Sequence, residues 1–246
     1  MDDTIERGTA AAPTPPHPAP DTPALLAGLL AFGLPGGVTS ARGVRGVCLR
    51  WKGELRPSPS ARWIPFSAEE TIEAQRSAFL WVARLSVGRA STLTVTDGYQ
   101  DGHGWAGTGI DAEAPAAHAT GPDFDRGELQ RYLGEIVLCP PILLAHSSLI
   151  WTAVGPSTLR VRDGADPTGA VVEIELDATG APLACRAARP RLVGKRSVVT
   201  PWSGEYGSSK LWDGLRVPSR LEASWILPQG AFTYVREEVV SLVALR

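Results

Sequence analysis

Cysteine is scarce and scattered in this 246-residue sequence, which contains only Cys48, Cys139 and Cys185. The number is odd, and no two cysteines have the two- or three-residue spacing of a zinc-binding pair. Both facts argue against a disulfide framework and against a zinc site. The simplest interpretation is that all three are reduced thiols in a reducing compartment.

Signatures of the common enzyme classes are missing as well. The sequence has no GxSxG nucleophile elbow, no P-loop and no HExxH motif. The glycine-rich stretch 102–109 is typical of a hairpin strand and not of a strand-to-helix phosphate cradle. The four histidines are far apart, and none has a second metal ligand at a workable spacing. We therefore predict no cofactor and no metal.

The chain also lacks an excess of one charge and a long apolar run. Its 24 basic and 26 acidic residues give a net charge of −2, so we predict no nucleic-acid partner. The apolar stretch 23–34 is about a dozen residues long, whereas a membrane-spanning helix needs ~20. Asp2, Asp3 and Glu6 replace the positive start of a signal peptide. These features predict a cytoplasmic protein without a membrane span.

The hydrophobic content of 43% is enough for a sizeable core in a chain of this length. Residues 1–22 are rich in proline and alanine, which predicts a disordered tail. No other composition shift marks a domain boundary. Residues 23–246 are therefore predicted to form a single domain.

Period-two alternation of apolar and polar residues dominates this domain. Val47, Leu49, Trp51 and Leu55 fall on one side of a segment whose other side is polar, which indicates an antiparallel strand with one buried face. Similar segments occur at 62–66, 79–87, 92–96, 149–154, 158–162, 171–177, 182–188, 196–202, 216–227 and 232–244. Short turns separate them, which favours a meander of neighbouring hairpins.

Helical signals are fewer. Pro23 and Gly33 bracket a short helix. Ser67 followed by Glu70 has the spacing of a capping box and predicts a brief helix over 67–77. The dipeptides starting at Asp97 and Asp101 are both turn signals, one for a hairpin and the other for a bulge or second turn.

The strongest helical pattern spans 125–137, with Asp125 as N-cap and Glu128 at the capping-box position. Its apolar stripe should pack across the sheet, and two prolines follow it. We thus predict an α+β fold: a large curved antiparallel sheet, a meander like a half-barrel, with a few short helices packed on one face.

Glu128, Arg131 and Glu135 form the best candidate for a catalytic cluster. Two carboxyl groups near an arginine at a cavity could perform acid–base chemistry or hold a polar head group. The alternative is that Glu128 caps the helix and the three residues form ion pairs on a solvent-exposed face. The two interpretations differ in whether this face of the helix meets water or the sheet.

Aromatic residues supply the candidate ligand contacts. Trp202 and Tyr206 share one side of a strand and could line an apolar surface with a polar tip. Tyr132 on the helix and Trp81 and Trp225 on strands complete the predicted set. Ordinary core packing is the alternative for Trp202 and Tyr206.

Several motifs resemble those of a bacterial family known only as a domain of unknown function. The run 127–135 (GELQRYLGE), followed by Pro140, is similar to its GELxRYLxE…P signature, and 200–204 (TPWSG) and 213–218 (DGLRVP) match a second one. The resemblance covers roughly 25–245 and implies no activity. The expected architecture is loosely similar to the half-barrel of periplasmic lipoprotein carriers.

Binding is the favoured function class. A curved sheet with a helix over its apolar face can enclose a small hydrophobic or lipid-like ligand. One alternative is a hydrolase or isomerase that uses Glu128, Arg131 and Glu135. Another is a protein-interaction scaffold, which needs an exposed apolar patch. Catalysis is less favoured because no nucleophile, metal cluster or cofactor loop is apparent, and the oligomeric state stays open.

Overall fold

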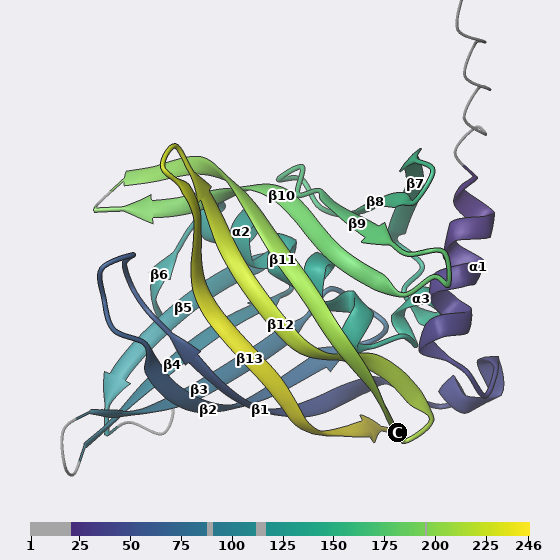
Figure 1. The fold of residues 1–246 in the computed structure, drawn as a ribbon, viewed down its shortest axis with the longest axis horizontal. Helices are drawn as coiled ribbons and strands as arrows, with labels where there is room; N and C mark the ends of the chain where they lie inside the picture. Colours follow the sequence, from purple (N-terminus) through teal and green to yellow (C-terminus); the bar gives the residue numbers. More distant parts are fainter. Residues whose placement is uncertain (1–20, 88–90, 112–116, 195) are drawn as a thin grey trace, which may run out of the picture.

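A single antiparallel sheet dominates the computed structural model, which describes residues 21–87, 91–111, 117–194 and 196–246 (Figure 1). Its strands are β1 Gly46–Leu55, β2 Ile64–Glu73, β3 Phe79–Val87, β4 Ser91–Gln100, β5 His103–Ile110, β6 Ala117–Thr120, β7 Leu149–Gly155, β8 Thr158–Asp163, β9 Val172–Leu176, β10 Pro182–Val193, β11 Arg196–Trp212, β12 Leu215–Leu227 and β13 Gly230–Leu245. The helices are α1 Thr22–Gly33, η1 Val38–Ala41, α2 Pro122–Glu135, η2 Ile136–Leu138 and α3 Ile142–Ala145. The predicted tail falls almost entirely outside the described residues.

The strands are ordered β6-β5-β4-β3-β2-β1-β13-β12-β11-β10-β9-β8-β7. Neighbours in sequence are thus neighbours in the sheet, except that β1 pairs with β13 in the middle. Within the described residues, β6 and β7 are the two edges and do not pair with each other. Figure 1 shows the sheet curving around α2. A mostly antiparallel, unclosed curved sheet with few helices agrees with the predicted α+β class.

The predicted helix over 67–77 is wrong, because 67–73 belongs to β2 and 74–77 lies in the connection to β3. Ala68, Glu70 and Ile72 are 4%, 1% and 0% exposed, and the residues between them face outward or are half-buried. This alternation suits a strand paired on both sides, with β1 and β3. The Ser67–Glu70 spacing matches a capping box, but pairing with two neighbours overrides that local preference.

Only one of the two Asp-Gly dipeptides makes a turn. Asp101 and Gly102 adopt φ values of 52° and 88° between β4 and β5. Asp97 and Gly98 lie inside β4, where Gly98 faces Trp105 across the strand pair. A Cβ at Gly98 would stand 2.3 Å from a ring carbon of Trp105, so glycine here makes room for the indole.

Helix α2 begins at Pro122, three residues before the predicted N-cap. Asp125 is not a cap: its Oδ1 accepts a hydrogen bond from the Gly104 amide at 2.8 Å. The helix contacts β4, β5 and β6 near one edge of the sheet and β9 and β10 near the other. Helix α2 therefore bridges the two ends of the open sheet, and its position inside the curve is visible in Figure 1.

The core lies between α2 and the concave face of the sheet. From the helix, Leu129, Tyr132 and Leu133 are completely buried. The Tyr132 hydroxyl lies 3.2 Å from the carbonyl oxygens of both Glu73 and Arg76, which anchors the helix to the β2–β3 turn. No helix within the described residues is long and apolar enough to cross a membrane.

A buried polar ring joins the β2–β3 turn to β7 and β8. Ser77 and Ser148 donate to the two carboxylate oxygens of Asp163 at 2.6 and 2.7 Å, and both hydroxyls contact ring nitrogens of His146. Burial raises the pKa of Asp163, but these hydrogen bonds lower it further, to below its usual value. Burial also lowers the pKa of His146. Each of the four side chains thus has a polar partner within the ring, which lies where α3 ends, beside His146.

Candidate functional site

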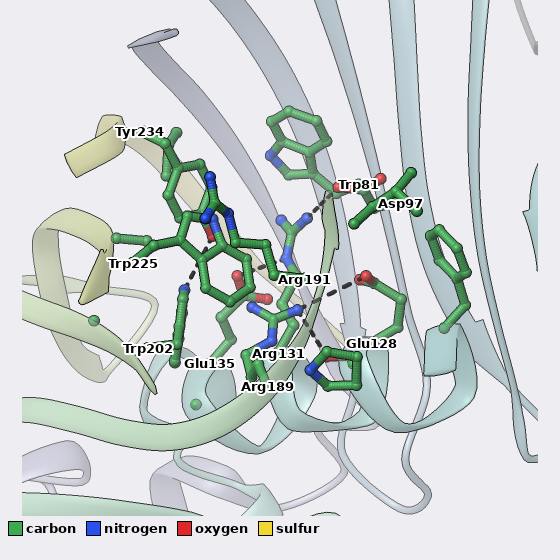
Figure 2. A pocket seen from close by; sticks show the side chains of 18 of the residues that line it. Trp81, Asp97, Glu128, Arg131, Glu135, Arg189, Arg191, Trp202, Trp225 and Tyr234 are labelled. Carbon is green, nitrogen blue, oxygen red and sulfur yellow. Dashed lines mark hydrogen bonds and ion pairs between the residues drawn. The ribbon is translucent and has the colours of Figure 1, made fainter. Parts of the chain in front are cut away.

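A cavity of about 580 Å³ lies between α2 and the concave face of the sheet (Figure 2). This volume falls within the range of about 300–1,000 Å³ that is typical of small-molecule sites. The walls come from α2 and from strands β3, β4 and β10–β13, with the end of β1 at the rim. Most of the lining is apolar, and Trp81, Trp202, Trp225 and Tyr234 provide large aromatic surfaces.

One face of α2 carries polar groups into this cavity. Gly127, Glu128, Arg131, Gly134 and Glu135 line it, at the spacing of residues that share a helix face. The side chains of Glu128, Arg131 and Glu135 are only 12–13% exposed. The predicted alternative of ion pairs on a solvent-exposed face is therefore wrong, because this face meets the sheet.

Arg131 holds three carboxylates from three different elements. Its Nε donates to Glu135 Oε1 at 2.9 Å, its Nη1 to Asp97 Oδ2 at 2.8 Å and its Nη2 to Glu70 Oε1 at 3.3 Å. Helix α2, strand β4 and strand β2 are thereby joined at one guanidinium group. A planar group with five N–H donors is suited to this role, whereas a lysine is not.

Aromatic rings enclose the same guanidinium. The Arg131 Cζ lies 5.0 Å from the ring centroids of both Phe79 and Trp81, which is within cation–π distance. Trp51 donates its indole N–H to Glu70 Oε2 at 3.0 Å. Both oxygens of the buried Glu70 carboxyl group are thus occupied, and the cluster is fixed on the side of the sheet.

A second arginine, Arg189 on β10, lies near Arg131 and Glu128 on the cavity side of α2 (Figure 2). Its Nη2 donates to the Gly127 carbonyl at 2.7 Å and lies 3.7 Å from Glu128 Oε1. Its guanidinium stacks on Trp202 with 4.8 Å between Cζ and the ring centroid. Trp202 in turn donates to the Tyr234 hydroxyl at 3.1 Å. Arg189 therefore connects the helix to the aromatic wall.

Carboxyl groups outnumber these two arginines. Five acidic side chains belong to the cluster: Glu70, Asp97, Glu128, Glu135 and Glu237. Burial raises the pKa of Glu128 to about 8 and that of Glu237 to about 8, even though Arg131 lowers both. Burial also raises the pKa of Glu70 and of Asp97. Near neutral pH the cluster therefore holds protons that ordinary carboxylates release.

Some polar atoms of the cluster have no hydrogen-bond partner in the described part of the chain. They include one carboxyl oxygen each of Glu128, Glu135 and Glu237, and the indole N–H of Trp81. Unpartnered buried polar atoms are rare in native proteins. Protons on the carboxyl groups, or donors on a bound molecule, would supply the missing partners of the oxygens.

A model of the family of unknown function DUF6544 matches residues 34–237, and this range includes the three motifs noted in the sequence. The chain belongs to DUF6544. The resemblance expected from the sequence is thereby confirmed. No curated protein matches the chain in sequence.

Two solved structures similar to this DUF6544 protein come from other families. A DUF1329 family protein from Desulfovibrio piger is 7% identical, covers 92% of this chain and 94% of its own, and has a TM-score of 0.51, which shows a shared fold. A putative outer membrane lipoprotein-sorting protein domain from Vibrio parahaemolyticus is 8% identical, with coverages of 87% and 93% and a TM-score of 0.41.

The predicted ligand contacts divide into two groups. Trp81, Trp202, Tyr206 and Trp225 line the cavity of this DUF6544 protein. Tyr206 also donates a short hydrogen bond to the carbonyl of Gly134 on α2. Tyr132 is completely buried on the other side of the helix and is not part of the lining. It supports the roof of the cavity without facing the interior.

Four charged residues of the DUF6544 site were not predicted from the sequence: Glu70, Asp97, Arg189 and Glu237. Their local sequence predicts a helix cap for Glu70 and a turn residue for Asp97. The parity of β2 was the available signal for Glu70, because it shares a strand face with Ala68 and Ile72. Among the described residues, no group of three or more histidine, cysteine or acidic side chains is arranged to hold a metal ion.

Proposed function

We propose that this protein binds a small amphiphilic molecule, with its apolar part in the cavity between α2 and the sheet. The observation that carries this proposal is a cavity of about 580 Å³ with aromatic walls and one polar, charged side. Filling such a space with apolar ligand surface is favourable at about 25 cal/mol per Å² removed from water. The cytoplasmic location expected from the sequence stays a prediction.

The charged cluster suggests which polar group the ligand carries. Glu128, Glu135 and Glu237 each have an oxygen without a donor, and each nitrogen of Arg131 already donates to a carboxylate. The Nε of Arg189 and the indole N–H of Trp81 are donors without an acceptor in the described part of the chain. A head group that both donates and accepts hydrogen bonds, such as an alcohol or a neutral amine, complements these acceptors and donors. A fatty-acid carboxylate would instead add a negative charge beside them. We therefore favour a hydroxyl- or amine-bearing ligand.

Filling the cavity tests the proposal. Ala223 lies on β12 in the cavity wall, so Ala223→Phe places a ring in the space for the ligand. We expect the wild-type protein to bind 1-dodecanol, measured by its effect on tryptophan fluorescence, and the variant to bind it at least about tenfold more weakly, a loss of about 1.4 kcal/mol. Ala231→Phe at an exposed position of β13 is the matched control.

Two results would contradict the proposal. One is saturable dodecanol binding that Ala223→Phe leaves unchanged, because the ligand would then occupy another site. The other is a wild-type protein that binds neither dodecanol nor dodecylamine and carries no small molecule into organic extracts examined by mass spectrometry. The melting temperatures of both variants show whether the added ring has disturbed the fold.

Acid–base catalysis is a second candidate, and the burial of Glu128 and Glu135 beside Arg131 supports it. A carboxyl group with a pKa of about 8, as for Glu128, exists partly in each protonation state near neutral pH, which suits a general acid or base. If the protein turns over any ester or isomerisable ketone in a substrate panel, Glu128→Gln or Glu135→Gln should lower kcat by about 100-fold or more. Unchanged turnover in both variants would reject catalysis by this cluster.

A further inference from the structure

The hairpin formed by β10 and β11 ends in an exposed apolar tip. Leu192, Val193, Val198 and Val199 are 60%, 49%, 48% and 57% exposed, and they lie within eight residues of one another. Figure 1 shows this hairpin extending farther than the neighbouring turn between β12 and β13. Apolar side chains gathered at one projecting tip indicate a contact surface, whereas single exposed ones do not.

The outer part of the same hairpin has no acidic residue. Residues 178–204 contain no aspartate or glutamate, although acidic residues slightly outnumber basic ones in the whole chain. Within this stretch, Arg186 pairs with Glu175, and Arg189 is buried against α2. Arg191 and Arg196 remain near the tip, opposite Val198 and Val193 respectively. The tip is therefore both apolar and basic.

This tip lies at the mouth of the cavity. Arg191, Leu192 and Ser197 line the cavity on the hairpin side, and the Arg191 guanidinium lies 5.8 Å from the ring centroid of Trp225 (Figure 2). Val193 and Val198 directly follow the lining residues Leu192 and Ser197 in the sequence, so the exposed valines adjoin the lining on both strands. A surface that touches the tip would therefore also touch the opening through which a ligand enters.

We propose that the tip of the β10–β11 hairpin docks on a lipid bilayer that contains anionic lipids. Leu192, Val193, Val198 and Val199 insert among the head groups while Arg191 and Arg196 contact phosphates. Apolar side chains flanked by basic ones are the combination that binds such interfaces, to a depth of about 5–10 Å. A second copy of this chain fits less well, since it would bring the same positive charges together. The proposal goes beyond ligand binding and does not depend on it.

Sedimentation of the full chain with vesicles tests the proposal. We expect binding to vesicles of phosphatidylcholine mixed with phosphatidylglycerol to be at least about tenfold stronger than to phosphatidylcholine alone, and to weaken with salt. The double substitution Val193→Ser with Val198→Ser should reduce binding by about tenfold or more. The matched control is Val240→Ser with Val243→Ser on β13, at valines that are 50% and 54% exposed, and it should bind like wild type.

Three outcomes would overturn the proposal: no binding to either vesicle, equal loss in the tip and control variants, or a concentration-dependent dimer that the tip substitutions abolish without any vesicle binding. Dodecanol binding in solution is measured on the same variants and should be unchanged. A tip variant that loses vesicle binding but keeps dodecanol binding separates the docking surface from the cavity.

Discussion

Replacing Arg131 with methionine should destabilise the protein by about 3–5 kcal/mol, because it leaves buried carboxylates without their partner. Glu70, Asp97 and Glu135 all accept hydrogen bonds from this guanidinium, and Glu70 is 1% exposed. Methionine keeps much of the side-chain volume, so the lost charge dominates the effect. We expect the melting temperature at pH 8 to fall by about 10 °C.

The control for this variant is Arg191→Met. Arg191 lies at the mouth of the cavity over Trp225, and its replacement should change stability by less than about 1 kcal/mol. The loss in Arg131→Met should shrink at pH 5, since the raised pKa values of Glu70 and Asp97 favour their neutral forms there. This role of Arg131 would be contradicted if Arg131→Met and Arg191→Met lost equal stability, or if the stability loss in Arg131→Met did not depend on pH.

Stability should also fall as the pH rises from about 5 to about 8.5. The pKa of Glu128 and that of Glu237 are raised to about 8 by burial, well above the value of about 4.3 in an unfolded chain. The folded state thus binds protons more tightly than the unfolded state. The resulting stability is complete below the unfolded pKa and is lost as the pH rises through the folded pKa. We expect the melting temperature to be higher at pH 5.5 than at pH 8.5 by about 5 °C or more.

Glu237→Gln isolates one contribution to this pH dependence. The amide cannot ionise, so the variant should melt at a higher temperature than wild type at pH 8.5, and its pH dependence should be shallower. The control Glu238→Gln changes an exposed neighbour that pairs with Lys210 at the surface. The melting temperature of Glu238→Gln should depend on pH as it does in the wild-type protein. A Glu237→Gln variant as sensitive to pH as wild type would show that this carboxyl group is already ionised in the folded protein.

Strand periodicity predicted most of the sheet. Val47, Leu49 and Trp51 are buried as their alternation predicts, because a strand with one buried face shows its parity in the sequence. Where a local helix signal competed with strand pairing, the predicted secondary structure was wrong. Ser67 and Glu70 resemble a helix start, yet they lie in a strand that is hydrogen-bonded on both sides.

The site was predicted only in its helical part. Glu128, Arg131 and Glu135 are one helix face and can be found from their spacing. Glu70 and Glu237 are contributed by strands from opposite ends of the chain, and each is a single acidic residue on an otherwise apolar strand face. Strand parity can show that such a residue faces inward, as for Glu70, but nothing local shows which partner it meets, because only the curvature of the sheet brings these charges to one arginine.

The pairing of β1 with β13 has a consequence for how the protein is made. The strand groups β1–β6 and β7–β13 can each form from local hairpins. The pairing of β1 with β13 is different, because partners such as Gly46 and Leu245 are about 200 residues apart in the sequence. During synthesis on the ribosome, the backbone N–H and C=O groups along one edge of β1 therefore stay unpaired until β13, the last strand, has been synthesised. Contacts of such long sequence separation form slowly. The unpaired edge of β1 is therefore the part of the nascent chain that can most easily pair with a strand of another chain.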